Sequence, residues 1–501
     1  MFDYKRLHPI TVLTNFFGEL KDLFIPFIFL FFIGSRGGGS AFWLKVKGFI
    51  LLFLLLAIIV SGVIKWLRFT YRLEDGELRI EYGLLVKKKR YIPFDRIQSL
   101  DFTEGVIQRP FGLVKVKIET ASGEEAELTA IKKADAFMIQ ETIKTVKRQL
   151  KQKAMQETEP ADLEATKETF LLRVSNKDLL LMASTSGGIG VVISAAVAFI
   201  LQFEDYIPYE KIFNELEGFV RNGVLFIITA IFAAVLLAWF ISILITMLKY
   251  NQFTIKVLDQ DLIITRGLLE KHQTTIPLHR IQAIKMVENP FRQLLGYATV
   301  YIHSAGGSAL DKEEGKITLL PIFKKANIPD VLGDILPEYL FDLSLQRAPK
   351  RAKRRFMMKN MIFSAVITII FSIFIWPYGL LGAFLFLYSF LIGIARYKAA
   401  GWNIQNQQLI LQYRQYLKYT IYFQKNRIQS LEERASWFQK RAHLATISAT
   451  AKSGFLTAEG VVPHLCEKDI NTIYQWYRPH KTVSSEHIEH ECMSSMDNPP
   501  T

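Results

Sequence analysis

Cysteine is scarce in this 501-residue sequence, which contains only Cys466 and Cys492. Two cysteines cannot build the multi-disulfide framework of a small secreted domain, so the composition gives no sign of an oxidising compartment. The N-terminus also lacks a short apolar segment followed by a small-residue cleavage site. We therefore expect no cleaved signal peptide, and we expect the first apolar run to be retained as a membrane anchor.

Sequence signatures of common enzymes are missing as well. Neither a His-Glu-x-x-His nor a Gly-x-Ser-x-Gly pattern occurs. The glycine-rich stretch at residues 34–40 lacks the preceding strand and the Gly-Lys-Ser/Thr ending of a phosphate-binding loop. Metal-capable side chains occur at His487, His490 and Cys492, but they lie in one polar tail without a second set of ligands. We therefore expect a non-enzymatic protein with no cofactor and no metal site.

Half of all residues are hydrophobic, and charge is absent from several long stretches. The charge-free stretches are residues 23–35, 48–64, 179–203, 222–248 and 360–395. A helix needs about 20 apolar residues to cross a bilayer, so residues 23–35 are ambiguous between a short span and a re-entrant segment. We interpret residues 360–395 as two spans. The alternative, one span and a buried segment, would place the third soluble unit on the opposite side.

The predicted spans also lack ionisable residues, which ion-coupled carriers and proton pumps usually keep inside the membrane. Small residues stand four apart in the third span, Ala183 with Gly187 and Gly190 with Ser194. This spacing predicts close helix packing. The spans therefore favour assembly with a copy or a partner over conduction.

Acidic residues are outnumbered, 47 against 61 basic ones, which gives a net charge of +14. Seven basic residues and no acid lie between Arg347 and Lys359, beside the third pair of spans. The loop from Glu204 to Glu217 instead carries five acids and one lysine. Because basic loops stay on the cytoplasmic side, six spans would place the N-terminus and all soluble units in the cytoplasm. No nucleic-acid-binding motif accompanies the charge, so we expect anionic membrane lipids as partners and no nucleic acid.

Between the apolar hairpins one pattern occurs three times. An Arg-Ile-Gln tripeptide begins at Arg96 and returns at Arg280 and Arg427, at offsets of 184 and 147 residues (280 − 96 and 427 − 280). The first offset also aligns Gly83 with Gly267. Around the tripeptides apolar and polar residues alternate, which is typical of half-buried strands. A stretch with helical spacing then follows, as at residues 134–153. Each copy is therefore one structural unit of strands and a terminal helix.

The repeated unit resembles the bacterial pleckstrin-homology-like (PH-like) domain. The residues that carry the resemblance are an Ile-Pro-x-x-Arg-Ile-Gln motif and a Pro-Phe-Gly-type turn, found at 92–98 with 110–112 and at 276–282 with 290–296. Three such domains, each after a hydrophobic hairpin, are similar to the YdbT-like membrane proteins. The resemblance implies a bent antiparallel barrel of seven strands, capped by a C-terminal helix, and implies no catalytic residues.

The third copy departs from the pattern. Arg414 and His443 replace turn glycines of the first two copies. We expect the same fold there with altered turns.

The expected fold class is a membrane protein with α-helical transmembrane hairpins and three β-rich PH-like domains. The predicted segments are 1–65 (N-terminal segment and transmembrane hairpin 1), 66–160 (PH-like domain 1), 161–248 (linker and hairpin 2), 249–345 (PH-like domain 2), 346–398 (basic segment and hairpin 3), 399–480 (PH-like domain 3) and 481–501 (a disordered tail).

Two sets of basic residues are candidate contacts for anions or lipid headgroups. They are the repeated arginines Arg96, Arg280 and Arg427, and the basic cluster Lys87, Lys88, Lys89 and Arg90. The simpler interpretation of the arginines is pairing with a neighbouring carboxylate that fixes a turn. The basic cluster is predicted in a strand–strand turn of the first copy only. Generic attraction to anionic lipid, about 1 kcal/mol per basic residue, is enough to explain it.

The leading functional hypothesis is a non-enzymatic, multi-pass protein of the bacterial inner membrane whose cytoplasmic PH-like domains act as docking or assembly modules. The partner would be another copy or a related membrane protein, and the location suggests envelope maintenance or stress defence. The alternative is a lipid or small-molecule transporter gated by the domains. The few polar residues of the spans, among them Ser184, Thr185, Ser186 and Thr229, do not decide between the two. An enzyme acting on lipids ranks last.

Overall fold

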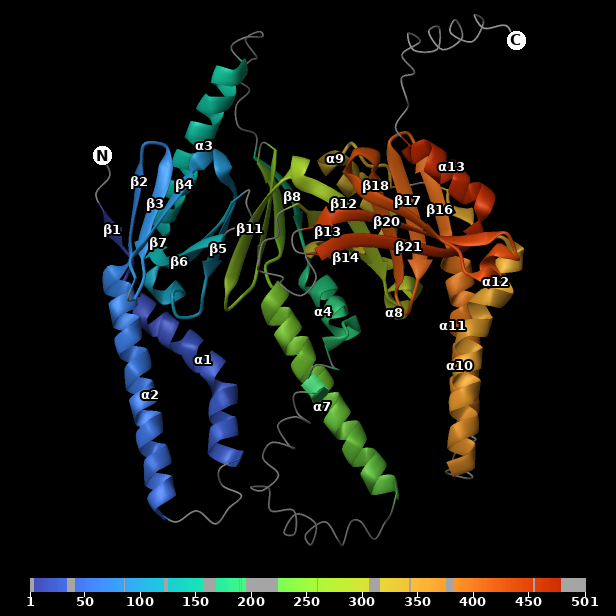
Figure 1. The fold of residues 1–501 in the computed structure, drawn as a ribbon, viewed down its shortest axis with the longest axis horizontal. Coiled ribbons are helices and arrows are strands. Elements are labelled where there is room, and N and C mark those ends of the chain that lie inside the picture. The colour runs from blue at the N-terminus through green and yellow to red at the C-terminus, as the bar shows by residue number, and fades with distance from the viewer. Residues whose placement is uncertain are drawn as a thin grey trace, which may run out of the picture. The chain divides into compact units, whose positions relative to one another are not determined.

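The computed structural model describes the chain in segments that include all three soluble domains. The described residues are 4–33, 41–84, 86–120, 125–155, 168–188, 190, 192–194, 224–258, 260–305, 316–341, 344–374, 382–453 and 456–478. They fall into two compact units, Met1–Asp342 with Lys452–Ala458, and Leu343–Ala451 with Glu459–Thr501. The first unit contains domains 1 and 2, and the second contains most of domain 3. Figure 1 shows the elements of each.

Domain 1 consists of two antiparallel sheets and a helix. The first sheet contains β1 (Lys5–Arg6), β2 (Thr70–Glu74), β3 (Glu77–Tyr82) and β4 (Lys88–Pro93). The second strand group contains β5 (Ile97–Glu104), β6 (Leu113–Thr120) and β7 (Glu125–Lys132), and α3 (Lys133–Met155) follows it. Apolar residues alternate along the strands, so that Leu78 and Ile80 of β3 are buried while their neighbours are partly exposed. This is the pattern from which the strands were predicted.

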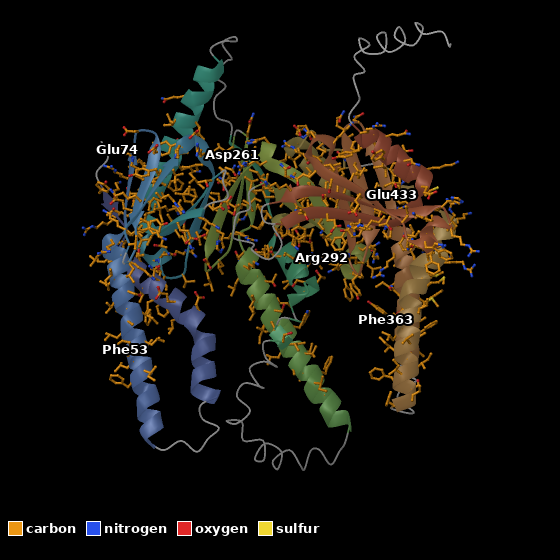
Figure 2. All side chains as sticks on the ribbon, viewed as in Figure 1. Phe53, Glu74, Asp261, Arg292, Phe363 and Glu433 are labelled. Carbon is orange, nitrogen blue, oxygen red and sulfur yellow. The ribbon has the colours of Figure 1, made fainter. Side chains whose placement is uncertain are left out.

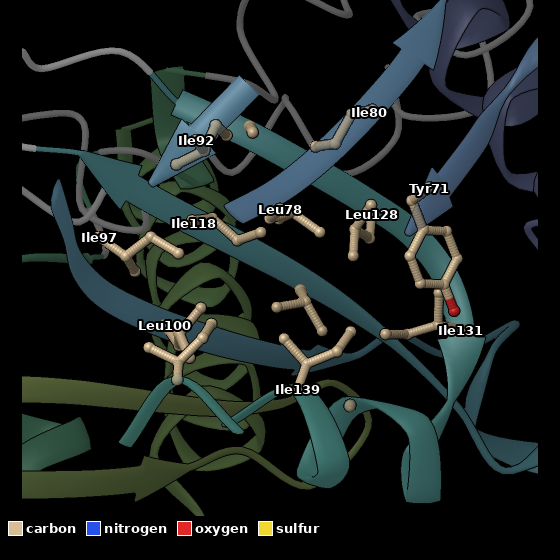
Figure 3. Packing of buried hydrophobic residues seen from close by; sticks show 14 of the residues in the cluster. Tyr71, Leu78, Ile80, Ile92, Ile97, Leu100, Ile118, Leu128, Ile131 and Ile139 are labelled. Carbon is tan, nitrogen blue, oxygen red and sulfur yellow. The ribbon is translucent and has the colours of Figure 1, made fainter. Parts of the chain in front are cut away.

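The core of domain 1 lies between the two strand groups and α3. Leu78 from β3, Ile118 from β6, Leu128 from β7 and Ile139 from α3 all contribute to it (Figure 3). Within the described residues the strands do not close into the barrel that the family resemblance implied. The chain leaves β4 at Pro93, which cannot donate a ladder hydrogen bond, and turns through the short helix η1 (Phe94–Arg96) into β5.

Domain 2 repeats this plan. Its strands are β8 (Glu168–Arg173), β9 (Thr254–Leu258), β10 (Asp261–Arg266), β11 (Lys271–Pro277), β12 (Ile281–Glu288), β13 (Tyr297–Ser304) and β14 (Lys316–Lys324). Its helices are η4 (Leu278–Arg280), α8 (Pro290–Leu294), η6 (Lys325–Asn327) and α9 (Ile328–Ile335). The matching order of elements explains why the two sequences align without a gap through the strands.

Domain 3 has the same order of elements. Its strands are β15 (Gln346–Arg347), β16 (Gly401–Gln405), β17 (Gln408–Arg414), β18 (Lys418–Gln424), β19 (Ile428–Arg434), β20 (Leu444–Ser453) and β21 (Leu456–Cys466). Its helices are η7 (Lys350–Ala352), η9 (Lys425–Arg427), α12 (Trp437–Lys440) and α13 (Glu467–Tyr477). His443 adopts the left-handed conformation (φ 50°) that Gly112 and Gly296 adopt in the other domains. The substitution therefore keeps this turn, because histidine tolerates that conformation better than most residues do.

Helices leave the sheets. The long apolar ones are α1 (Ile10–Ile33), α2 (Ala41–Arg68), α7 (Val224–Tyr250), α10 (Lys353–Phe374) and α11 (Gly382–Ala399), whereas α4 (Asn176–Thr185) has only 10 residues. Four of the described helices, α2, α7, α10 and α11, are long and apolar enough to cross a membrane. Large apolar side chains such as Phe53 and Phe363 project from them (Figure 2) and are mostly exposed. Exposed apolar surfaces on helices of this length are typical of membrane-spanning segments.

The stretch 360–395 contributes to two helices, α10 and α11, which pack against each other. The prediction of two spans is confirmed at the level of helices. The first predicted stretch, 23–35, lies within or just after α1, which begins earlier, at Ile10. The acidic loop 204–217 and the tail 481–501 lie outside the described residues.

Each helical segment is inserted between two neighbouring strands of one sheet. Strand β1 pairs with β2, β8 with β9 and β15 with β16, always in antiparallel register. The predicted segments began each domain after its hairpin and therefore left out the preceding strand. Two-residue strands such as β1 and β15 are too short to show alternation, so they could not be predicted from the pattern.

Candidate docking surfaces

The repeated arginines end the three short helices η1, η4 and η9 and precede a buried isoleucine in every domain. Their surroundings differ. Arg96 is exposed, whereas Arg280 and Arg427 are half-buried. Burial lowers the pKa of Arg280, and the negative charge of Glu119 acts in the opposite direction. The structure thus places the three arginines at equivalent turns without giving them a common environment.

Arg280 lines a small pocket where domain 2 meets domain 1. Ser99 and Glu119 of domain 1 and Thr275 and Ser304 of domain 2 contribute to its wall. Ser99 Oγ donates a buried hydrogen bond of 2.8 Å to Glu119 Oε2. The arginine of the second copy therefore lies close enough to a carboxylate to feel its charge.

Domains 1 and 2 share one sheet at this junction. Strand β5 of domain 1 pairs with β11 of domain 2 in antiparallel register, which gives the order β7-β6-β5-β11-β10-β9-β8. Thr103 lies opposite His272, with 3.2 Å between Oγ1 and Nδ1, and Asp101 Oδ1 accepts a 3.2 Å hydrogen bond from the Thr275 amide. The sequence did not predict this pairing, because the alternation of a strand does not reveal which strand covers its edge.

The basic cluster lies at the matching strand of domain 1. The 184-residue offset maps Lys87 onto Lys271, so β4 is the equivalent of β11. Lys88, Lys89 and Arg90 belong to β4 itself and not only to the predicted turn. Lys87 Nζ lies 2.6 Å from a Glu81 carboxylate oxygen, and this hydrogen bond lowers the pKa of Glu81. The cluster is thus partly neutralised, yet Lys87, Lys88 and Lys89 stay exposed.

The turn after the fifth strand of each domain exposes large apolar side chains. They are Val106 and Phe111 in domain 1, Phe291, Leu294 and Leu295 in domain 2, and Trp437 and Phe438 in domain 3. Each turn also contacts the base of its own helical hairpin. Ile107 packs against a buried cluster that includes Ile10 at the start of α1. Arg351, which lies just before α10, donates a 3.1 Å hydrogen bond to the His443 carbonyl. These apolar turns therefore lie where the domains meet the helices.

Arg292 makes the corresponding contact in domain 2 (Figure 2). Its Nε donates to Thr185 Oγ1 at 2.9 Å and its Nη2 donates to the Met182 carbonyl at 3.1 Å, at the C-terminal end of α4. Asn289 Nδ2 donates to the Thr185 carbonyl at 2.7 Å. Burial lowers the pKa of Arg292. The sequence did not single out this residue, because domains 1 and 3 carry glutamine, Gln108 and Gln439, at the matching positions.

Among the described residues, no group of three or more His, Cys, Asp or Glu side chains could hold a metal ion. The metal-capable tail residues lie outside the described part of the chain.

Comparison with known proteins gives two matches. The family model of the bacterial PH domain matches residues 25–147, 205–332 and 360–481. The UPF0699 transmembrane protein YdbT of Bacillus subtilis (strain 168) is 38% identical over 492 residues, which cover 95% of this chain and 98% of that protein. No solved structure matches the chain. Each matched range of the family model includes helical as well as strand residues, in keeping with hairpins that are inserted into the domains.

Proposed function

The chain belongs to the family of transmembrane proteins with bacterial PH domains, and on this premise we propose that its domains are docking and assembly modules. The protein would be non-enzymatic and would hold its three PH-like domains at the cytoplasmic face of a bacterial inner membrane. Its partners would be another copy or a related membrane protein, together with anionic lipids, in envelope maintenance or stress defence.

The pairing of β5 with β11 is the observation that carries this proposal. Two PH-like domains of this chain already associate through strand edges, by main-chain hydrogen bonds and a few side-chain contacts. Strand addition of this kind is a general mode of protein recognition, in which the backbone supplies affinity and side chains supply specificity. A domain that uses one sheet edge internally can present its other edge to a partner.

The basic run and the apolar turns support the placement at the membrane. Seven basic residues precede or begin α10, where an anionic leaflet would attract them. The turns with Phe111, Phe291 and Trp437 lie at the bases of the hairpins, where aromatic side chains suit the membrane–water interface. The basic cluster and the repeated arginines would add generic attraction to anionic headgroups.

A lipid or small-molecule transporter gated by the domains is the second candidate, favoured by the contacts of Arg292. This residue joins domain 2 to the end of α4, and the helix is interrupted at Ser186 and Gly187 directly afterwards. Interrupted helices are common in transporters. A movement of domain 2 would therefore reach the second hairpin.

Purification of the intact protein in mild detergent, with mass spectrometry of the proteins and lipids that accompany it, tests these functions. A stoichiometric protein partner or a defined oligomer with only bulk lipid is expected for docking modules. A monomer without a protein partner would refute that function. One enriched lipid species that is lost on Arg292→Gln, and retained on Arg478→Gln at an exposed position, would favour transport instead.

A further inference from the structure

We infer that the outer edge of β4 in domain 1 binds strand β19 of domain 3 in a second copy of this chain. The pairing would be the one that joins β5 to β11 within the chain. This inference rests on the proposed docking function and names its partner. One copy offers one β4 edge and one β19 edge, so the association is head to tail and produces rings or filaments.

The repeat supplies the template. Adding both offsets (184 + 147 = 331) maps Thr103 of β5 onto Arg434 of β19, and subtracting 184 maps His272 of β11 onto Lys88 of β4. The register of the internal junction then predicts the register between copies. The predicted pairs are Ala435 with Lys87, Arg434 with Lys88, Glu433 with Lys89 and Glu432 with Arg90.

The two edges are exposed where their equivalents are buried. In β5 most residues are buried, whereas in β19 every residue after Ile428 except Leu431 is exposed. In β11 Thr275 is buried, whereas its equivalent in β4, Tyr91, is 55% exposed. Within the described residues β4 and β19 are the end strands of the sheets β1-β2-β3-β4 and β19-β20-β21. Such edges are templates for strand addition unless something covers or blocks them.

Charge favours this partner and this register. The β4 edge is basic, and the predicted register places Glu433 opposite Lys89 and Glu432 opposite Arg90. Opposite-charge pairs across strands contribute about 0.2–1 kcal/mol each, so they select a register that the backbone stabilises. One pair is unfavourable, since Arg434 would face Lys88. Its guanidinium already makes two 2.6 Å hydrogen bonds to Glu432, which offsets part of its charge and leaves Glu433 with Lys89 as the main favourable pair.

Disulfide trapping tests the contact directly in membranes. The full-length chain with Cys466→Ser and Cys492→Ser is expressed in two tagged forms, one with Lys88→Cys and one with Arg434→Cys. Both substitutions remove the unfavourable pair, and side chains directly opposite each other lie within reach of a disulfide. Mild oxidation should give a cross-linked dimer that carries both tags. Lys132→Cys, at an exposed position of β7, replaces Lys88→Cys as the matched control and should give none.

Charge reversal gives a second, independent readout. Lys89→Glu and Glu433→Lys should each weaken self-association of the detergent-solubilised protein about tenfold, which corresponds to about 1.4 kcal/mol. The double variant, in which the pair is restored with reversed sign, should recover most of the loss. Lys132→Glu should leave the association unchanged. Self-association is measured by mass photometry over a dilution series.

Three results would overturn the inference. They are the absence of the two-tag dimer, a disulfide that forms only within one chain when both cysteines are placed on it, and single charge reversals without effect. If a different protein still co-purifies in fixed ratio, only the second-copy inference fails and the docking function stands. If the chain purifies alone as a monomer, both fail.

Discussion

At the scale of single residues, Arg292 joins domain 2 to the C-terminal end of helix α4. We expect Arg292→Gln to destabilise the protein by about 2 kcal/mol, because the shorter amide cannot replace all hydrogen bonds of a buried guanidinium. Thermal unfolding in detergent should show a midpoint several degrees lower. Arg478→Gln, at an exposed position, should leave the midpoint within about one degree. An unchanged midpoint for Arg292→Gln would contradict the anchoring role.

His303 makes the stability of domain 2 depend on pH. Burial, followed by the charges of Lys285 and Lys316, lowers its pKa from 6.5 to about 3. Below pH 6.5 the His303 imidazole binds a proton in the unfolded chain but not in the folded chain, so stability falls as the pH drops from 6.5 towards 3. At pH 4.5 this amounts to about 3 kcal/mol.

The prediction is that His303→Gln flattens this dependence. The loss of stability between pH 7 and pH 4.5, measured by thermal unfolding, should be smaller in the variant than in the parent protein. His279→Gln, which changes an exposed histidine, should retain the parent profile. If His303→Gln and the parent protein lost the same stability between pH 7 and pH 4.5, His303 would not be the group that causes the loss.

At the scale of elements, the turn between β10 and β11 requires a glycine, Gly267. Gly267, between β10 and β11, has φ 106°, and a Cβ there would lie 1.9 Å from the Glu270 carbonyl oxygen. We expect Gly267→Ala to destabilise the protein by at least about 2 kcal/mol, because both strain and a backbone clash oppose it. Gly333→Ala in α9 meets nothing within 4 Å and should stabilise by about 0.5–1 kcal/mol. Chemical denaturation of both variants checks the contrast.

The sequence predicted where strands and helices lie better than it predicted which strands pair with each other. Alternation located strands such as β3, helical spacing located α3, and the uncharged stretch 360–395 yielded α10 and α11. The two-residue strands β1 and β15 were not predicted, because two residues are too few to show a periodic pattern. The pairing of β5 with β11 was not predicted either, because a local sequence pattern does not show which strand edges pair.

The candidate site was predicted to a similar degree. The basic residues 87–90 and the repeated arginines were located, since charge and repetition are visible in one dimension. Their positions on a sheet edge and at an interdomain pocket depend on pairing between distant segments. Arg292 was missed because domains 1 and 3 carry glutamine where it stands.

At the scale of the whole molecule, the strand pairs fix the parity of membrane crossings. Strand β8 and strand β9 lie in one sheet, so the segment between them must cross a membrane an even number of times. The same holds between β15 and β16, which excludes a single crossing by residues 360–395. Because β5 pairs with β11, domains 1 and 2 lie on the same side of the membrane.

Cysteine accessibility tests which side that is. In a chain without Cys466 and Cys492, an impermeant maleimide applied to intact cells should label Lys211→Cys, in the acidic loop predicted to lie outside. Lys89→Cys, in β4, should react only after the membrane is permeabilised. Labelling of Lys89→Cys in intact cells would place the domains on the outer face and contradict the cytoplasmic proposal.

Inserting hairpins between neighbouring strands also sets an order for synthesis. Eighty residues (254 − 173 − 1) separate the end of β8 from the start of β9, and 53 (401 − 347 − 1) separate β15 from β16. Each leading strand leaves the ribosome first and stays unpaired until both helices have entered the bilayer and the following strand is made. A sheet can therefore be completed only when its helical segment crosses the membrane an even number of times. A segment with only one inserted helix leaves an open strand that a protease or chaperone can recognise.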